Sequence, residues 1–404
     1  MKKDFGIDKT MKKSFLALAV AALAATSIAS TASATTVYDK DGTSMAIYGR
    51  VQSVYYSEQQ SGVSNDEGSF NSSARLGVDA RTPITSGIAA FAKAEWEAAN
   101  GNDEPDGNDG FDARYLWVGL DFGQFGQVKV GKFEEAIKYA IGPTDHWEDS
   151  GCTGLAGNDD RRESVVQYQW SGYGVDAFLS YAFAKDNEHL DGAYFNKENV
   201  DIDYSVSGAL GYTSPDVLFG PIGVRAGFLY GQLADNPQEN SNNIADLTNV
   251  GGNVQGVDVW LDDYTQYAVS AFWGSLAQGP YVAAVYQQRD FGTNVKVNGV
   301  SANGNLDYTV SGYEFTVAYT FANGLRLATG YETQKVELDD YEGDVEAATV
   351  PVLALWRVNP NFDVWAEARF DAGTDDDENG DNFDIVAGTT YAENFFALGL
   401  RYNF

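Results

Sequence analysis

The segment Phe362-Asp363-Val364-Trp365-Ala366-Glu367-Ala368-Arg369-Phe370-Asp371 alternates small or apolar side chains with mostly charged ones, residue by residue. Successive side chains of a β-strand point to opposite faces, so this period of two predicts a strand with one apolar and one polar face. The same alternation recurs in Ser73–Ala80, Val175–Phe183, Thr309–Phe321 and Leu325–Gln334. Such strands are typical of a sheet that separates two different solvents.

The connections between these segments alternate in length. Seven short turns are expected at 83–87, 123–126, 171–174, 215–223, 274–280, 322–324 and 359–361. Eight long polar segments centre on Gly62, Asp103, His146, Asn187, Asn242, Asn294, Asp340 and Asp377. This arrangement requires about 16 strands, and a soluble sandwich would not sort its connections so strictly by length. We therefore predict an all-β, antiparallel transmembrane β-barrel with short periplasmic turns, long external loops and its apolar face toward lipid.

Composition excludes several classes of protein. The chain has 404 residues, with 26 Lys and Arg against 58 Asp and Glu, and a formal net charge of −32. An acidic excess excludes a nucleic-acid partner held by a general basic surface. The 44% hydrophobic and 14% aromatic content excludes a disordered polyanion, and the single cysteine excludes an internal disulfide framework. Beyond the N-terminus, no apolar stretch is long enough for a transmembrane helix.

The N-terminal segment has the pattern of a secretory signal peptide. Lys12 and Lys13 precede an apolar run over 15–25, and Ala32-Ser33-Ala34 is an A-x-A cleavage site. We expect residues 1–34 to be removed and residues 35–404 to form the barrel domain. Met11 is a natural start, which leaves open that 1–10 are an upstream-start extension. Removing five lysines and two aspartates leaves 21 basic and 56 acidic residues, a net charge of −35.

Catalytic and metal-binding motifs are weak. His146 and His189 are the only histidines, Cys152 lacks a partner motif, and neither G-x-S-x-G nor H-E-x-x-H occurs, so we expect no enzyme activity. The segment Asp375-x-Asp377-x-Asn379-Gly380 begins like a calcium loop, but its twelfth position is Val386. We predict no resident cofactor or metal. Weak Ca²⁺ or Mg²⁺ bridging between the acidic outer rim and anionic lipopolysaccharide is the more credible role for divalent ions.

Several stretches resemble the general diffusion porins of the Gram-negative outer membrane. They are Val37–Gly42, Ile47–Arg50, Ser73–Gly77, Tyr115–Phe122, Gly131-Lys132 and the terminal alternation of Phe396, Leu398, Leu400, Tyr402 and Phe404. The resemblance implies a 16-stranded barrel, a homotrimer and passive diffusion of small hydrophilic solutes. It also implies that Tyr402 and the final Phe404 belong to the signal read by the outer-membrane assembly machinery.

The same resemblance implies a third loop that folds into the lumen, with carboxylates facing a ladder of arginines. Residues 131–160 occupy its position. Asp145 and Asp149 match the two loop carboxylates, and Glu148 is a plausible substitute. The matching ladder residues are Arg50, Arg75, Arg114 and Arg161.

Strand alternation independently places Arg75 and Arg161 on polar faces, although Val165 breaks the second pattern. Arg162 directly follows Arg161, the last of the matching arginines, which leaves open that the match to the family is shifted by one residue here. The family's Pro-Glu-Phe-Gly-Gly is replaced here by Glu148-Asp149-Ser150-Gly151-Cys152, so the path of the loop is not set by the match.

Opposed acidic and basic rims would select solutes by size, polarity and charge. With the acidic excess of the mature chain, we expect cation preference. Two alternatives stay open at this stage: a structural or adhesive barrel whose acidic loops bind partners, and a solute-specific porin.

Overall fold

The computed structural model describes residues 34–57, 68–99, 111–149, 151–155, 161–190, 199–234, 242–246, 257–297, 300–301, 306–339, 344–374, 376–377, 380–381 and 394–404. Nearly all of the predicted signal peptide lies outside these residues. So do Asp375 and Asn379 of the calcium-like segment.

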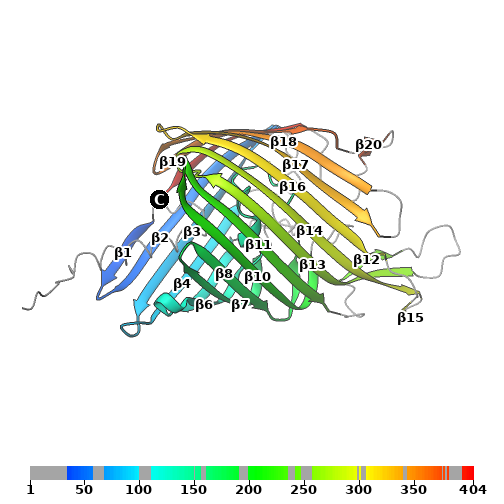
Figure 1. Cartoon of the computed structure of the whole chain (residues 1–404), viewed down its shortest axis with the longest axis horizontal. Coiled ribbons are helices and arrows are strands. Elements are labelled where there is room, and N and C mark those ends of the chain that lie inside the picture. Colours follow the sequence, from blue (N-terminus) through cyan, green and yellow to red (C-terminus); the bar gives the residue numbers. More distant parts are fainter. Residues whose placement is uncertain are drawn as a thin grey trace, which may run out of the picture.

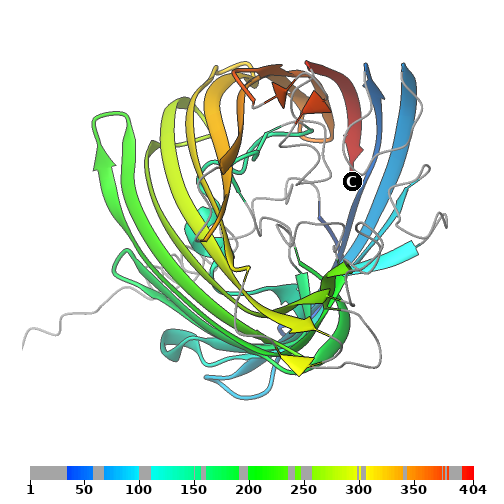
Figure 2. The same cartoon turned by 90° about the vertical axis from the view of Figure 1, so that its right-hand side faces the viewer.

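Sixteen antiparallel strands form a closed ring (Figures 1 and 2). They are β2 (Thr43–Tyr56), β3 (Ser69–Pro83), β4 (Ala89–Ala99), β5 (Phe111–Asp121), β6 (Gln127–Glu134), β7 (Arg161–Gly172), β8 (Val175–Ala182), β10 (Asn199–Val217), β11 (Gly220–Leu233), β13 (Val257–Gly274), β14 (Gly279–Val297), β16 (Tyr308–Thr320), β17 (Leu325–Leu338), β18 (Asp344–Asn359), β19 (Phe362–Asp371) and β22 (Phe395–Asn403). Each strand pairs with its neighbours along the chain, and all seven predicted short turns join consecutive strands. The predicted barrel is confirmed.

The remaining elements are short. β1 (Thr35–Lys40), β9 (Lys185–His189), β12 (Asn243–Asp246) and β15 (Val300–Ser301) extend the sheet, and β20 (Asp376–Asp377) pairs with β21 (Gly380–Asp381). The part of the chain that the structure describes has two helical turns, η3 (Gly123–Phe125) and α2 (Lys138–Ile141). Among the described residues, no helix has the length and apolar character that crossing a bilayer needs.

The ring closes where β22 pairs with the second half of β2, from Arg50 opposite Asn403 to Tyr56 opposite Ala397. β1 pairs with the first half of β2, so β1 and β22 lie along the same side of it. Gly49 N donates to Phe404 O over 2.8 Å. A Cβ at Gly49 would lie 2.5 Å from the Phe404 ring, so only glycine fits at this closure.

Side chains alternate between the two surfaces of the wall. In β22, Phe396, Leu398, Leu400 and Tyr402 are exposed, whereas the residues between them are buried. The exposed apolar set faces lipid, as the period-two pattern predicts. The alternate set faces the interior and lines the passage.

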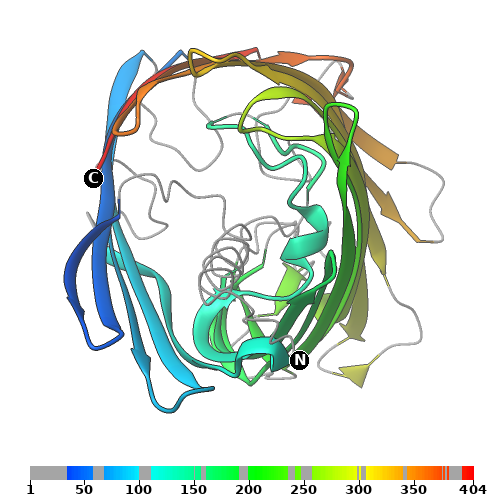
Figure 3. The same ribbon diagram turned by 60° about the vertical axis from the view of Figure 1, so that its left-hand side comes forward.

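A cluster of buried apolar side chains covers part of the inner face of β10 to β17. Its buried side chains pack against α2 and the segment around Leu155, and include Ile202, Leu229, Leu261, Phe291, Val310 and Val336. Figure 3 shows α2 inside the ring, next to these strands. This apolar wall gives the segment between β6 and β7 a surface against which to fold inward.

Candidate pore constriction

The third loop lies between β6 and β7, and its described residues 135–146 follow the inner wall of the barrel in strand order. Its contacts join Ala136 to Ser180 of β8, Ile137 to Ser207 of β10, Tyr139 to Arg225 of β11, Ala140 to Ser270 of β13, Pro143 to Tyr281 of β14 and His146 to Thr316 of β16, over 2.6–3.0 Å. Wall side chains thus satisfy backbone groups that a loop buried away from water would otherwise leave unpaired. The inward third loop is confirmed.

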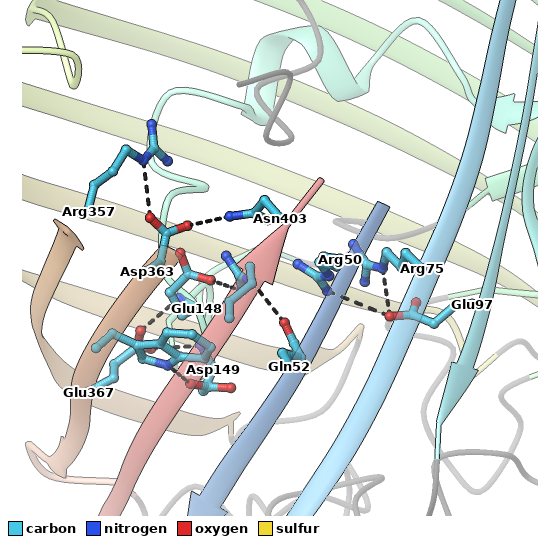
Figure 4. A network of polar contacts seen from close by, with 12 residues as sticks. Arg50, Gln52, Arg75, Glu97, Glu148, Asp149, Arg357, Asp363, Glu367 and Asn403 are labelled. Carbon is cyan, nitrogen blue, oxygen red and sulfur yellow. Dashed lines mark hydrogen bonds and ion pairs between the residues drawn. The ribbon is translucent and has the colours of Figure 1, made fainter. Parts of the chain in front are cut away.

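The tip of the loop is held by one carboxylate of the wall. Glu367 of β19 accepts the backbone N–H of Glu148 at 2.7 Å and that of Asp149 at 3.1 Å (Figure 4). A charged acceptor makes these hydrogen bonds stronger than neutral ones. The loop then turns back, and Thr153 and Gly154 contact β17 and β16.

The three predicted loop carboxylates have different partners. Asp145 lies 2.7 Å from Lys138 Nζ, within the loop itself. Burial opposes ionisation of Asp145, but the Lys138 ammonium outweighs it and holds the pKa of this carboxyl below its usual value. Cys152 Sγ donates to the other oxygen over 3.6 Å. Burial, followed by the charge of Asp145, raises the pKa of the Cys152 thiol well above its usual value, which makes it a poor nucleophile.

Glu148 pairs with an arginine that the sequence comparison did not indicate. Its carboxylate forms an ion pair with Arg401 of β22, whose Nε donates to Gln52 Oε1 at 3.0 Å. Burial opposes the charge of Glu148, yet Arg401 and then Arg50 hold its pKa below the usual value. The pair ties the loop tip to the strand that closes the barrel.

Asp149 lies against the wall. Tyr56 Oη donates to Asp149 Oδ1 at 2.9 Å, and Trp365 Nε1 donates to Oδ2. Burial, together with the neighbouring charge of Glu148, raises the pKa of Asp149 to about 6 despite these two hydrogen bonds. Its charge therefore changes within an experimentally accessible pH range.

Three of the four predicted arginines converge on one carboxylate of β4. Glu97 lies 2.6 Å from Arg75 Nε, 2.6 Å from Arg114 Nη1 and 3.6 Å from Arg50 Nη2. Figure 4 shows Arg50 and Arg75 directed toward Glu97. Arg114 also lies 3.2 Å from Glu95. We call Arg50, Arg75, Arg114, Glu95 and Glu97 the arginine cluster.

Arg161 stands apart from this cluster. Its Nε lies 3.5 Å from Glu134, and its guanidinium carbon lies 5.7 Å from the centre of the Tyr115 ring. Arg162 is almost fully buried, with Nε 3.5 Å from Glu135.

A register shift explains this region. Gly131 pairs with Val165 but Phe133 with Arg162, and Ser164 has φ of 56°. The bulge resets the alternation, which accounts for the break at Val165.

Sequence reasoning missed Arg401, Lys138, Glu95, Glu97 and Glu367. Arg401 could have been found, because it alternates with the outward Leu400 and Tyr402. Among the described residues, no group of three or more His, Cys, Asp or Glu side chains is arranged to hold a metal ion.

A model of the family described as Gram-negative porin matches residues 17–376. Outer membrane protein S2 of Salmonella typhi is 24% identical over 416 residues, covering 98% of this chain and all of that protein. Outer membrane porin protein OmpD of Salmonella typhimurium is 25% identical over 399 residues, with the same coverage.

Solved structures share the fold. Salmonella typhi OmpF in complex with daunomycin superposes with a TM-score of 0.65 at 18% identity, covering 92% of this chain and all of that one. A trimer form of OmpT of Vibrio cholerae gives 0.62 at 17% identity, covering 90% and 99%. An anion-selective porin from Comamonas acidovorans gives 0.57 at 16% identity, covering 90% and 100%. With the family match over most of its length, the chain belongs to the Gram-negative porin family and is a passive diffusion channel of the outer membrane.

Proposed function

We propose that this porin is a homotrimer with a preference for small hydrophilic cations. The observation that carries the preference is the compensation of its constriction arginines. Arg50, Arg75 and Arg114 each lie within ion-pair distance of Glu97 or Glu95 on their own wall. Their positive field in the lumen is therefore offset locally, and the acidic excess of the whole chain dominates what a passing ion meets.

Planar-bilayer recordings in a salt gradient test this proposal. The expected reversal potential has the sign of a cation-selective pore, and an anion-selective sign would refute the preference. Glu97→Gln should shift the reversal potential toward anions, because it leaves three arginines with one carboxylate. Glu337→Gln is the matched control, since Glu337 is only partly buried and pairs with Lys335 at 2.9 Å.

The outer face of β4 supports the trimer. Glu95 and Glu97 point inward, so Ala90, Ala92, Ala94 and Trp96 alternate outward, whereas strands such as β16 carry exposed Tyr313, Phe315 and Tyr319 on that face. The three outward alanines leave a narrow row of small side chains along the first half of β4, where a second barrel can approach closely. Three equal closing steps in a single-channel recording are expected, and isolated single steps would contradict the trimer.

Solute flux into liposomes separates this porin from the adhesive or solute-specific alternatives. We expect uptake that falls smoothly with solute size, whereas a plugged adhesive barrel would give none. We also propose that residues 1–34 direct export, so the mature protein should begin at Thr35 when its N-terminus is sequenced.

At the outer rim, we propose that divalent ions bridge acidic loops such as Asp376–Asp377 to lipopolysaccharide. Addition of a chelator should then loosen bound lipopolysaccharide without loss of the barrel.

A further inference from the structure

Two buried carboxylates lie under the returning arm of the third loop. Glu314 of β16 and Glu332 of β17 are direct partners in the strand register, and each is only 1% exposed. Direct partners on one face of an antiparallel pair have Cβ atoms about 5 Å apart. Their carboxyl groups are therefore neighbours inside the barrel wall.

Each carboxylate binds the loop through one oxygen. Gly154 N donates to Glu314 Oε1 over 3.1 Å, and Thr153 N donates to Glu332 Oε2 over 3.0 Å. The remaining oxygens, Glu314 Oε2 and Glu332 Oε1, are buried and have no hydrogen bond of good geometry; the buried Thr144 hydroxyl, which also lacks such a partner, lies beside Glu314. Burying an acceptor without a donor is costly, so two such oxygens in one place need an explanation.

The surroundings do not supply a compensating charge at close range. From the loop, Asp145 and Cys152 face the pair, and from β19 Arg369 acts on Glu332 from a distance. The neutral Gln287 of β14 and Thr349 of β18 contact Gly154 and Thr153. Within the described part of the chain, neither Glu314 nor Glu332 has a cation within 4.0 Å.

We propose that Glu314 and Glu332 share one proton and, in that state, position the third loop in the pore. Two carboxylates this close, without a cation, cannot both be ionised in the wall. A proton on one free oxygen makes it a donor to the other, which satisfies both groups that lack partners. The singly protonated pair then presents two acceptors, spaced to hold Thr153 and Gly154.

Loss of the shared proton sets two like charges against each other. At about 5 Å and an intermediate effective dielectric constant, their repulsion corresponds to about a hundredfold change in an equilibrium. The strain is relieved when one carboxylate swings into the water-filled lumen and takes its loop N–H with it. The returning arm leaves the wall, and the constriction changes shape.

Single-channel recordings between about pH 6 and about pH 10 test this positioning role. The wild-type channel should give a steady open-channel current at the acidic limit of this pH range and frequent current fluctuations at the alkaline limit. Glu332→Gln and Glu314→Gln should be quiet throughout, because the amide permanently supplies the donor and still accepts from the loop. Glu332→Ala should fluctuate at every pH. Glu337→Gln, on the same strand but only partly buried, should keep the wild-type profile.

An infrared difference spectrum gives a second readout. The spectrum of the wild type minus that of Glu314→Gln should contain the carbonyl band of a neutral carboxylic acid near neutral pH. This band should disappear over the pH range in which the current fluctuations begin. A wild-type channel insensitive to pH, glutamine variants that keep its profile, or absence of the band would each overturn the proposal. None of these outcomes depends on cation preference.

Discussion

We predict that Asp149 links pH to ion selectivity in this porin. Burial, with the charge of Glu148, raises the pKa of Asp149 to about 6. A carboxyl group with that pKa is about nine-tenths ionised at pH 7 and about one-tenth ionised at pH 5. We expect the cation preference of the wild-type channel to fall over this interval. Asp149→Asn should show the lower preference already at pH 7 and no further change.

The size of the effect follows from the position of Asp149 at the loop tip. A unit charge about 6 Å from an ion in water contributes about 0.7 kcal/mol. That energy changes the local concentration of a monovalent cation about threefold, and that of an anion about threefold in the opposite direction. The permeability ratio should therefore fall by up to about tenfold in dilute salt, and by less when the Debye length is short.

The assay is the reversal potential in a potassium chloride gradient at pH 5, 6 and 7. Asp344→Asn is the control, because it removes the same charge at the exposed end of β18, where Asp344 pairs with Lys335. It should preserve the pH dependence. A wild-type reversal potential that stays constant over this range, or an Asp149→Asn channel that follows the wild type, would refute the reasoning.

Three further predictions concern the loop and the terminal strand. Glu148→Gln leaves the buried guanidinium of Arg401 without its carboxylate and should lower the free energy of unfolding by about 3 kcal/mol; unchanged denaturation in detergent micelles would contradict this. Burial lowers the pKa of His146 to about 4. Below pH 6.5 the unfolded chain therefore binds a proton at His146 more readily than the folded chain does. This difference should lower the free energy of unfolding by about 3 kcal/mol as pH drops from 6.5 to 4. His146→Gln should flatten that slope. Phe404→Ala should reduce the amount of barrel in the outer membrane several-fold, and equal amounts after fractionation would argue against an assembly role.

The barrel could be predicted because the strand period reports directly which solvent each face meets. Leu398 and Leu400 alternate with Gly399 and Arg401, and their exposure follows the same period. Short turns also leave local signals, such as Gly174 with a φ of 80°. These features depend on neighbouring residues alone, so sequence reasoning reaches them.

The constriction depends on contacts between residues far apart in the sequence. The partners of the loop tip, Glu367 and Arg401, lie more than 200 residues away. Alternation identifies inward strand residues but does not say which of them meets the loop. Bulges add to the difficulty, because the irregularity at Ser164 changes which residues face inward at the start of β7, from Arg161 to Glu163. The sequence therefore indicated Arg50, Arg75 and Arg114 individually, but neither their carboxylate partners nor Arg401.

The distribution of partners changes how the constriction should be understood. Simple opposition of an acidic loop to a basic wall would place the whole field across the passage. Here the wall arginines meet Glu95 and Glu97, and on the loop Glu148 meets Arg401 while Asp145 meets Lys138. The charges of the wall and of the loop are therefore largely compensated by partners on their own side or across the contact, so the transverse field depends on small differences in this pairing. Single substitutions that unbalance one pair, such as Glu97→Gln, should therefore alter selectivity more than their share of the total charge implies.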